Sequence, residues 1–197
     1  MTTTVMRVLD SVFGHPRGPG GRLGGALMAR ANAAQERWAV HAAGLAPGQR
    51  VLVVGPGPGV GLALAAAAVR PGGHVVAVDP SATMRAMAAR RCAAAIAEGL
   101  VDLRAGGAED TGCTGASREA VISVNNVMLW DRPAGFAESH RVLRPGGLLV
   151  ITVHRHVLGV PGERLRAEAE AAGFAETRLT ERPRCLNSPA VQLLARR

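Results

Sequence analysis

A glycine-rich segment directly after an apolar run carries the strongest chemical signal in this sequence. Residues 51–61 read VLVVGPGPGVG, and Gly55, Gly57 and Gly59 stand between a run typical of a buried strand and a helical stretch that begins near Val60. Glycines at such a bend accept positive φ angles and let the backbone come close to a bulky ligand. The N-terminus of the following helix offers unpaired N–H groups and the positive end of the helix dipole. The segment predicts a binding site for a nucleotide-type cofactor.

An acidic residue stands where it could hold the ribose of such a cofactor. Asp79 closes the next apolar run, HVVAVD, twenty residues after Gly59. A carboxylate at the end of the second strand of a nucleotide-binding sheet can accept hydrogen bonds from both ribose hydroxyls. The glycine spacing is GxGxG and not the GxGxxG of dinucleotide-binding proteins, because Val60 and Leu62 occupy the positions of the third glycine. A plain strand-to-helix turn without a ligand is the alternative interpretation.

Two asparagines and a tryptophan follow the fourth apolar run. The segment SVNNVMLWDRP, residues 123–133, leaves this run at the edge where open α/β sheets bind their ligands. Asn125 and Asn126 could orient a substrate or a cofactor, and the face of Trp130 attracts a cation. In the alternative interpretation, the asparagines cap the next helix together with Asp131 while Trp130 packs in the core.

Two histidines follow the fifth apolar run, in the segment TVHRHVLG. Alternating positions of a strand share a face, so His154 and His156 could both point into one pocket. A neutral imidazole can accept the proton that a hydroxyl nucleophile must lose. A polar loop role is the alternative, and the HxH pattern predicts no metal site because no third ligand stands at a suitable spacing.

All of these residues follow segments of strand length that alternate with helical stretches. The strand-like runs cover residues 51–54, 74–78, 100–104, 120–124 and 148–153, and the helical stretches cover residues 60–70, 81–97, 131–141 and 162–172. This alternation predicts a parallel sheet with helices on both faces. Gly173 stands where a left-handed cap ends the last helix. The runs 174–180 and 190–195 leave no room for a helix between them and predict an antiparallel hairpin.

The N-terminal part of the chain predicts a helical cap. Apolar residues recur at helical spacing over residues 23–42 and stop at Gly44, after the Gly/Pro-rich stretch 14–25. The predicted fold is α/β: a Rossmann-like, doubly wound, mostly parallel seven-stranded sheet with a C-terminal antiparallel β-hairpin and an N-terminal helical cap. We divide the chain into a cap or lid over residues 1–44 and a sheet domain over residues 45–197.

The composition excludes several classes of protein. The 197 residues suit one domain, and 48% hydrophobic with 19% charged residues is typical of a packed globular protein. Three Phe, two Trp and no Tyr leave few aromatic platforms for single-stranded nucleic acid. No stretch resembles a signal peptide or a membrane span, and three scattered cysteines fit a reducing compartment. We expect a cytoplasmic protein without a membrane partner.

The net charge of +8 comes entirely from arginine, because the 23 basic residues include no lysine. An anionic partner such as RNA or a phosphorylated substrate is one interpretation of this charge. A general bias of the sequence towards arginine is the other interpretation. The arginines are spread along the chain and never form a run of five, which favours the bias.

The sequence resembles the class I S-adenosylmethionine-dependent methyltransferases over about residues 45–195. The resemblance rests on VLVVGPGPG, HVVAVDPSATM, GGAED at 106–110, RVLRPGGLLVITVH at 141–154 and the closing hairpin. It implies that the sheet domain is a class I methyltransferase domain with S-adenosylmethionine as its cofactor. It also implies that the glycine loop approaches the methionine portion, Asp79 the ribose and Met84 one face of the adenine.

The sequence departs from this family at acidic positions. The acid that helps to hold the methionine amino group, two positions before the first loop glycine, is Val53 here, and the acid that accepts from the adenine amino group is Gly107. Glu109 is the predicted replacement for the second acid, with Asp110 as the alternative. The acid that commonly begins the fourth strand is Glu119. These departures leave open a catalytically degenerate protein that only binds the cofactor or a partner.

The resemblance further implies that the N-terminal helix closes over the pocket and influences the choice of substrate. Trp38 and His41 are three residues apart and share a helix face. We expect them to contact the substrate together with Asn126, Trp130 and His156, and the Gly/Pro-rich stretch to form the flexible entry to this lid. A helix that only covers the edge of the sheet is the alternative.

We therefore expect a methyltransferase that acts on a small-molecule acceptor, as a monomer or a homodimer, with His154 and Asn125 as catalytic residues. Nucleic acid is a less favoured acceptor. An NAD(P)-dependent reductase is disfavoured by the GxGxG spacing, by the terminal hairpin, and by the absence of the Tyr and Lys that form its catalytic pair.

Overall fold

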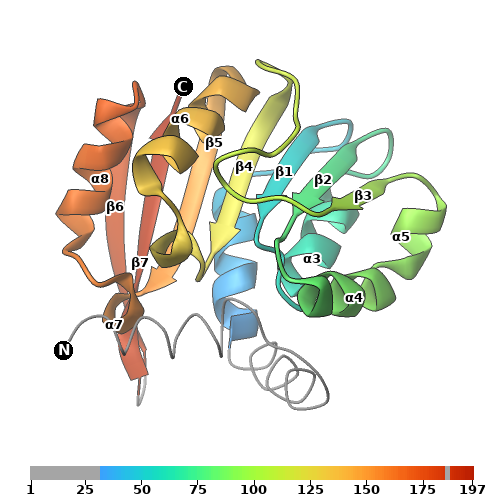
Figure 1. Ribbon diagram of the computed structural model, residues 1–197, viewed down its shortest axis with the longest axis horizontal. Coiled ribbons are helices and arrows are strands. Elements are labelled where there is room, and N and C mark those ends of the chain that lie inside the picture. The colour runs from blue at the N-terminus through green and yellow to red at the C-terminus, as the bar shows by residue number, and fades with distance from the viewer. Residues whose placement is uncertain (1–31, 185–186) are drawn as a thin grey trace.

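The computed structural model describes residues 32–184 and 187–197, which form a seven-stranded sheet flanked by helices (Figure 1). The strands are β1 (Arg50–Val54), β2 (His74–Val78), β3 (Val101–Arg104), β4 (Arg118–Val124), β5 (Leu143–His154), β6 (Ala175–Arg184) and β7 (Asn187–Arg196). Their order across the sheet is β3-β2-β1-β4-β5-β7-β6. Strands β1 to β5 are parallel, and β7 runs antiparallel to both β5 and β6. The predicted mostly parallel sheet with a C-terminal hairpin is confirmed.

Helices cover both faces of the sheet. They are α3 (Val60–Ala68), α4 (Ala82–Arg91), α5 (Ala93–Ala97), the 3₁₀ turn η2 (Val127–Leu129), α6 (Arg132–Val142), α7 (Arg155–Leu158) and α8 (Gly162–Ala171). A further helix over residues 32–42 precedes β1. Helices α6 and α8 pack on one face, and α3, α4 and the helix over residues 32–42 pack on the other.

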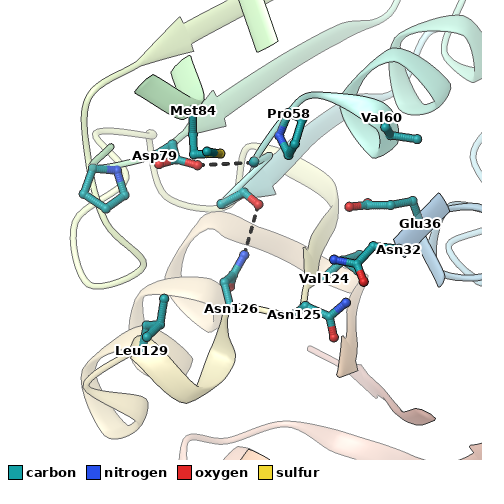
Figure 2. A pocket seen from close by; sticks show the side chains of 13 residues that line it. Asn32, Glu36, Pro58, Val60, Asp79, Met84, Val124, Asn125, Asn126 and Leu129 are labelled. Atoms are coloured by element: carbon teal, nitrogen blue, oxygen red, sulfur yellow. Dashed lines mark hydrogen bonds between the residues drawn. The ribbon is translucent and has the colours of Figure 1, made fainter. Parts of the chain in front are cut away.

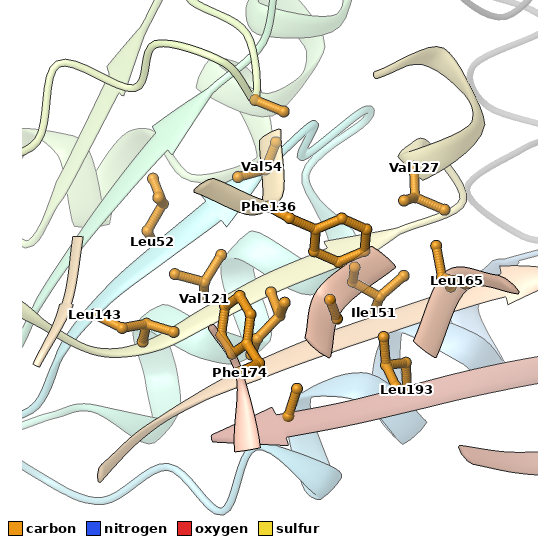
Figure 3. Packing of buried hydrophobic residues seen from close by; sticks show 14 of the residues in the cluster. Leu52, Val54, Val121, Val127, Phe136, Leu143, Ile151, Leu165, Phe174 and Leu193 are labelled. Atoms are coloured by element: carbon orange, nitrogen blue, oxygen red, sulfur yellow. The ribbon is translucent and has the colours of Figure 1, made fainter. Parts of the chain in front are cut away.

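Alternate residues of each strand supply two separate cores. Leu52 of β1 points into the core under α6 and α8, and its neighbour Val53 points into the core under α3. Figure 3 shows the first core, where the rings of Phe136 and Phe174 meet edge to face with centroids 6.5 Å apart. Because both faces of the strands are buried, the strands appear in the sequence as continuous apolar runs.

Two glycines end helices where the sequence predicts it. Gly44 has φ +56° after the helix over residues 32–42, and Gly173 has φ +97° after α8. A left-handed residue at this position stops a helix, and glycine adopts it without a steric penalty. The Gly/Pro-rich stretch 14–25, the rest of the predicted cap before residue 32, and Cys185 lie outside the described residues.

The helical stretch predicted over residues 81–97 is divided into two helices. The break falls at Cys92, which has φ −103° and ψ 18° between α4 and α5. The Cys92 side chain is 4% exposed, and its Sγ lies 3.9 Å from the carbonyl oxygen of Gly59. Packing against the glycine loop therefore overrides the continuous helical pattern of the sequence.

The predicted strand over residues 148–153 begins earlier than expected. Strand β5 starts at Leu143, which pairs with Arg118, and the register then shifts so that Leu148 pairs with Ala120. Sequence periodicity does not reveal the first pairing because a turn-like RPGG segment interrupts the apolar pattern. The short elements η2 and α7 are also absent from the sequence-based prediction.

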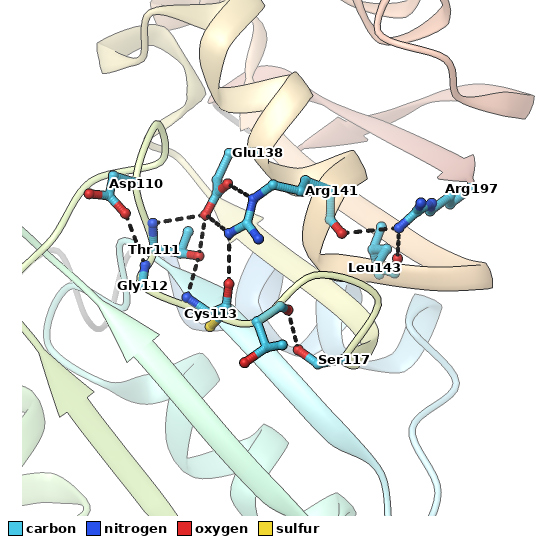
Figure 4. Close-up of polar contacts among 10 residues, drawn as sticks. Asp110, Thr111, Gly112, Cys113, Ser117, Glu138, Arg141, Leu143 and Arg197 are labelled. Carbon is cyan, nitrogen blue, oxygen red and sulfur yellow. Dashed lines mark hydrogen bonds and ion pairs between the residues drawn. The ribbon is translucent and has the colours of Figure 1, made fainter.

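A buried carboxylate fixes the loop between β3 and β4 onto α6 (Figure 4). Glu138 accepts hydrogen bonds from N and Oγ1 of Thr111 at 3.0 and 2.6 Å and from Nη2 of Arg141 at 2.9 Å. Arg141 Nη2 also donates to the carbonyl oxygen of Cys113 at 2.7 Å. Burial acts to raise the pKa of Glu138, but the hydrogen bonds from Arg141 and Thr111 outweigh it, so the pKa is lowered. This network holds the loop that carries Glu109.

Candidate functional site

A pocket opens at the carboxyl ends of β1, β2 and β4 (Figure 2). Strand β1 lies between β2 and β4, so the pocket stands beside the point where the strand order reverses. Ligands of open α/β sheets bind at such a point. The pocket is lined by Asn32, Glu36, Gly55, Gly57, Pro58, Val60, Asp79, Pro80, Met84, Val124, Asn125, Asn126 and Leu129.

The lining includes about half of the residues that the sequence predicts for the site. Those present are Gly55, Gly57, Asp79, Met84, Asn125 and Asn126. Those that do not line the pocket are Gly59, Glu109, Trp130, His154, His156, Trp38 and His41. Two lining residues that the sequence analysis does not single out, Asn32 and Glu36, come from the N-terminal helix.

The three loop glycines all adopt left-handed conformations but have different surroundings. Their φ angles are +64° at Gly55, +50° at Gly57 and +85° at Gly59. A Cβ atom on Gly57 would meet nothing within 4 Å, so this position faces the open pocket. A Cβ atom on Gly59 would lie 2.9 Å from Cα of Ala88. Gly59 thus allows α3 to pack closely on α4, whereas Gly57 leaves space for a ligand.

Asp79 connects the end of β2 to the glycine loop. Its Oδ2 accepts a hydrogen bond from N of Gly57 at 3.2 Å, and its Oδ1 accepts one from N of Ser81 at 2.9 Å. The side chain is 5% exposed and lines the pocket. These two backbone bonds orient the carboxylate at the pocket wall.

Met84 enters the pocket from the first turn of α4. Ser81 caps this helix, and its Oγ accepts a hydrogen bond from N of Met84 at 3.3 Å. The Met84 side chain is 3% exposed and lines the pocket close to Asp79 (Figure 2). A flexible thioether at this position suits contact with a flat apolar ring face.

The Asn126 side chain joins the ends of β1 and β4. Its Nδ2 donates to the carbonyl oxygens of Val54 at 2.6 Å and of Gly55 at 3.1 Å. Its Oδ1 accepts from Oγ of Ser123 at 2.6 Å and from Nε1 of Trp130 at 2.9 Å. Four bonds use the hydrogen-bonding capacity of one amide, so Asn126 shapes the pocket wall.

Trp130 is partly buried and packs against the core under α6 and α8. Its ring meets Phe136 edge to face with centroids 6.1 Å apart, and a Cβ on Gly135 would lie 2.7 Å from its Cε3. Asp131 caps α6 by accepting a hydrogen bond from N of Ala134 at 3.4 Å. The structure therefore matches the alternative interpretation for Trp130 and Asp131, but the cap of α6 involves Asp131 without the two asparagines.

Asn125 belongs to a hydrogen-bonded chain that links the sheet to the N-terminal helix. Its Oδ1 accepts from the backbone N of His154 at 2.9 Å, so its Nδ2 is the donor to Oε1 of Gln35 at 2.7 Å. Nε2 of Gln35 then donates to Nδ1 of His154 at 3.2 Å. Nε2 of the same ring lies 3.1 Å from Oδ1 of Asn32.

The two histidines lie together, but not because they share a strand. His154 is the last residue of β5 and His156 belongs to α7, so the expected strand alternation is wrong. The helical turn nevertheless places the two ring centroids 5.4 Å apart. Both ring nitrogens of His154 face hydrogen-bond partners from the N-terminal helix.

The helix over residues 32–42 borders the pocket with a different face from the one expected. Trp38 lies under the guanidinium of Arg182, whose Cζ is 5.7 Å from the ring centroid, and His41 is exposed. Asn32 and Glu36 are four residues apart, share a helix face and line the pocket instead. This spacing is the sequence signal that could have identified them.

Glu36 is a carboxylate without a hydrogen-bond donor among the described residues. A Cβ on Gly61 would lie 2.2 Å from its Oε2, so the carboxylate occupies space that only a glycine leaves open at the start of α3. Burial raises the pKa of Glu36 to about 8. An acidic group in such surroundings is typical of a functional site.

Comparison with known proteins decides the family. The sequence model of the methyltransferase domain family matches residues 52–151, which is 100 of the 197 residues. The chain is also 30% identical, over 162 residues, to the uncharacterized methyltransferase YdaC of Bacillus subtilis (strain 168), covering 78% of this chain and 87% of that protein. This chain belongs to the class I S-adenosylmethionine-dependent methyltransferases.

Solved structures show that this methyltransferase shares its fold with distant relatives. Phosphoethanolamine N-methyltransferase 2 of Haemonchus contortus, in complex with S-adenosylmethionine, has a TM-score of 0.71 at 18% identity and covers 83% of this chain. This methyltransferase spans 52% of that chain, about half its length. Geranyl diphosphate C-methyltransferase of Streptomyces coelicolor A3(2) has a TM-score of 0.68 at 18% identity, covering 94% of this chain and 87% of that one.

The structure shows what occupies the acidic positions at which this methyltransferase departs from its family. Val53 is 5% exposed within the core and offers no carboxylate. At Gly107, a Cβ would lie 2.6 Å from Oε2 of Glu109, so the Glu109 carboxylate lies over the glycine. The other oxygen of Glu109 accepts from N of Asp131 at 2.8 Å. Glu119 is remote from the pocket and accepts from N of Arg50, at the start of β1.

Over residues 32–184 and 187–197, no helix is long and apolar enough to cross a membrane. The same residues contain no group of three or more His, Cys, Asp and Glu side chains that could hold a metal ion.

Proposed function

We propose that this protein transfers the methyl group of S-adenosylmethionine to a small-molecule acceptor, and that the pocket at the ends of β1, β2 and β4 binds the cofactor. The observation that carries the proposal is the open space above Gly57, next to an oriented and buried Asp79. A Cβ on Gly57 would meet no atom, so the backbone is exposed to a ligand there. The residues of the pocket fit a nucleoside with an amino-acid tail.

Several parts of the cofactor have a suitable partner in or beside this pocket. Asp79 offers acceptor oxygens for the two ribose hydroxyls, and Met84 offers an apolar surface for the adenine ring. The left-handed backbone at Gly57 allows the methionine portion to lie close to the chain. Glu109 lies over Gly107 in the loop after β3, outside the pocket lining, and is the proposed acceptor for an adenine amino group that extends beyond the lining.

We expect the chain to contribute to catalysis by binding the cofactor, orienting the acceptor and excluding water from the pocket. Bound S-adenosylmethionine supplies an electrophilic methyl group, so the protein must mainly hold a nucleophile in line with that group. Asn125 and His154 serve this purpose by fixing the N-terminal helix against the carboxyl ends of β4 and β5. We assign them positioning roles in place of the catalytic roles expected from the sequence.

A compact acceptor suits the arrangement of the pocket. The N-terminal helix closes one side with Asn32 and Glu36, and Leu129, which is 41% exposed, borders the other. Two structural relatives are named for small acceptors, phosphoethanolamine and geranyl diphosphate. Nucleic acid is the less favoured acceptor. The proposed location is the cytoplasm, and the proposed oligomeric state is a monomer or a homodimer.

Transfer of labelled methyl groups tests the acceptor class. The purified protein is incubated with methyl-labelled S-adenosylmethionine and a cell extract that has been separated into small molecules, RNA and protein. We expect label to accumulate in the small-molecule fraction. Label confined to RNA or protein would overturn the assignment of a small acceptor.

A catalytically degenerate protein is the second candidate, and Val53 is the observation that favours it. An apolar residue at this buried position removes one acidic partner of the cofactor. This candidate predicts binding of S-adenosylhomocysteine together with the absence of label transfer in every fraction of the extract. Label transfer to any acceptor would exclude it.

A further inference from the structure

Two carboxylates lie on opposite sides of the pocket. In Figure 2, Asp79 and Met84 lie on one side, and Asn32 and Glu36 lie on the other, with Pro58 of the glycine loop between them. Asp79 is held by backbone N–H groups of the glycine loop and of Ser81. Glu36 has no such partner among the described residues. The two acids therefore differ in what they leave available to a ligand.

The glycine at position 61 makes room for the Glu36 carboxylate. Gly61 lies in the first turn of α3, is buried, and would place a Cβ 2.2 Å from Oε2 of Glu36. Glycine is a poorer helix former than alanine. Its presence here lets the carboxylate of the N-terminal helix approach the start of α3, next to the glycine loop, where an alanine would collide with it.

The cofactor has a suitable group for each of these two acids: ribose hydroxyls for Asp79 and a positive charge for Glu36. S-adenosylmethionine and S-adenosylhomocysteine both carry an α-ammonium group at the end of the molecule that is remote from the adenine. A ligand with its ribose at Asp79 and its chain over Gly57 therefore extends towards the side of the pocket where Glu36 lies. A partly buried carboxylate without a partner favours a cationic ligand group, because pairing offsets the cost of desolvating the charge.

We infer that Glu36, from the N-terminal helix, binds the α-ammonium group of the cofactor. This inference rests on the proposed placement of the cofactor in the pocket. Val53, two positions before the loop, is apolar and buried, and cannot take this role. Glu109 lies over Gly107 in the loop after β3 and bonds to the backbone of Asp131, so it belongs to a different side of the site. The N-terminal helix thereby becomes part of the cofactor site.

Glu36 would also make cofactor binding depend on pH. Among the described residues, the titratable groups nearest to it are Asp79 across the pocket, His154 beyond Asn32 and Gln35, and Arg37 and His41 on its own helix. None of these charges contributes to the raised pKa of Glu36, which results from burial alone. Pairing with an ammonium group requires the ionised carboxylate, so the affinity should rise with pH up to about 8.

The test compares two ligands that differ in the ammonium-bearing tail. Calorimetry measures the affinity of the wild-type protein and of Glu36→Gln for S-adenosylhomocysteine and for methylthioadenosine, which lacks the amino-acid portion. We expect Glu36→Gln to lower the affinity for S-adenosylhomocysteine by roughly 10- to 100-fold, the loss expected when a charged hydrogen bond is removed. The affinity for methylthioadenosine should change by less than about twofold, which assigns the effect to the tail.

A pH series and a matched variant complete the design. Below pH 8, wild-type affinity for S-adenosylhomocysteine should fall by up to about tenfold per pH unit, and Glu36→Gln should remove this dependence. Arg37→Gln, an exposed change on the same helix, should leave both affinities unchanged. Thermal melting of each variant confirms that it is folded.

The outcomes of this test separate a wrong role for Glu36 from a wrong placement of the cofactor. If the wild-type protein binds S-adenosylhomocysteine and a folded Glu36→Gln variant binds it equally well, the role of Glu36 is overturned while the cofactor site stands. Equal losses for both ligands would also overturn it, because the tail would not be involved. If the wild-type protein binds neither ligand, the placement of the cofactor fails, and the inference fails with it.

Discussion

Two neighbouring glycines of the loop should respond very differently to the addition of a single carbon atom. At Gly55, a Cβ would lie 2.0 Å from Nδ2 of Asn126, whose amide holds the carbonyl oxygens of Val54 and Gly55. At Gly57, a Cβ would meet nothing within 4 Å. Both residues have positive φ, +64° and +50°. Alanine at either position carries the same backbone strain, but only at Gly55 does it displace a neighbour.

The magnitudes separate the two variants clearly. An alanine in the left-handed region costs about 1–2 kcal/mol, and we expect this loss of unfolding free energy for Gly57→Ala. For Gly55→Ala, the displaced Asn126 amide loses partly buried hydrogen bonds, which adds about 1–3 kcal/mol for each group left unsatisfied. With one group left unsatisfied, the expected total for Gly55→Ala is about 2–5 kcal/mol, against a typical domain stability of about 5–15 kcal/mol.

Urea unfolding of both variants, together with titration by S-adenosylhomocysteine, measures these effects. Gly55→Ala should have a much lower midpoint of unfolding than Gly57→Ala. Gly57→Ala should remain folded and lose affinity for the ligand, because its methyl group enters the pocket. Equal destabilisation of the two variants, within about 0.5 kcal/mol, would refute the role assigned to Asn126. Unchanged affinity in Gly57→Ala would refute the position assigned to the ligand.

Three further predictions concern buried polar side chains. Glu138→Gln should lower the unfolding free energy by about 1–3 kcal/mol at pH 7. Because the folded-state pKa of Glu138 lies below its ordinary 4.5, this difference should disappear as the pH falls through that lowered pKa, as urea unfolding at neutral and acid pH would show. For Glu36 the pH dependence of the unfolding free energy has the opposite sign. Its pKa is raised from 4.5 to about 8, so the protein loses stability as the pH rises through this range. Glu36→Gln should therefore gain stability over the wild-type protein by up to about 1.4 kcal/mol per pH unit across that window, and parallel curves for the two proteins would contradict this. Gln35→Leu should break the hydrogen bonds to Asn125 and His154 and accelerate amide hydrogen exchange in the helix over residues 32–42. Unchanged exchange would show that the helix is held by apolar packing alone.

Most of the fold could be predicted from the sequence, because the strands, the helix ends and the hairpin depend on local patterns. The strand-like runs, the glycines that end helices at Gly44 and Gly173, and the missing space for a helix before the last strand all predict structure without knowledge of distant contacts. The errors occur where distant contacts decide the outcome. Cys92 breaks a continuous helical pattern by packing on the glycine loop, and Leu143 extends β5 by pairing with Arg118.

The site is predicted less completely than the fold for a similar physical reason. Gly57 and Asp79 could be identified because the chain must turn and place an acid at the end of a strand. Asn126 appears in the sequence as a polar residue open to a ligand, but its partner Val54 is 72 residues away and occupies its amide. Glu36 is not predicted from the sequence because Trp38, two residues later in the same helix, offers a stronger chemical signal.

Titration of the protein with S-adenosylhomocysteine, with and without the change Asp79→Ala, tests the central claim most directly. A ribose held by a buried carboxylate predicts one binding site on the wild-type protein and a loss of roughly tenfold or more in affinity for the variant. NADPH, titrated in parallel, should produce no binding heat. Absence of binding to the wild-type protein, or equal affinity in a folded Asp79→Ala variant, would contradict the placement of the cofactor at the carboxyl edge of the sheet.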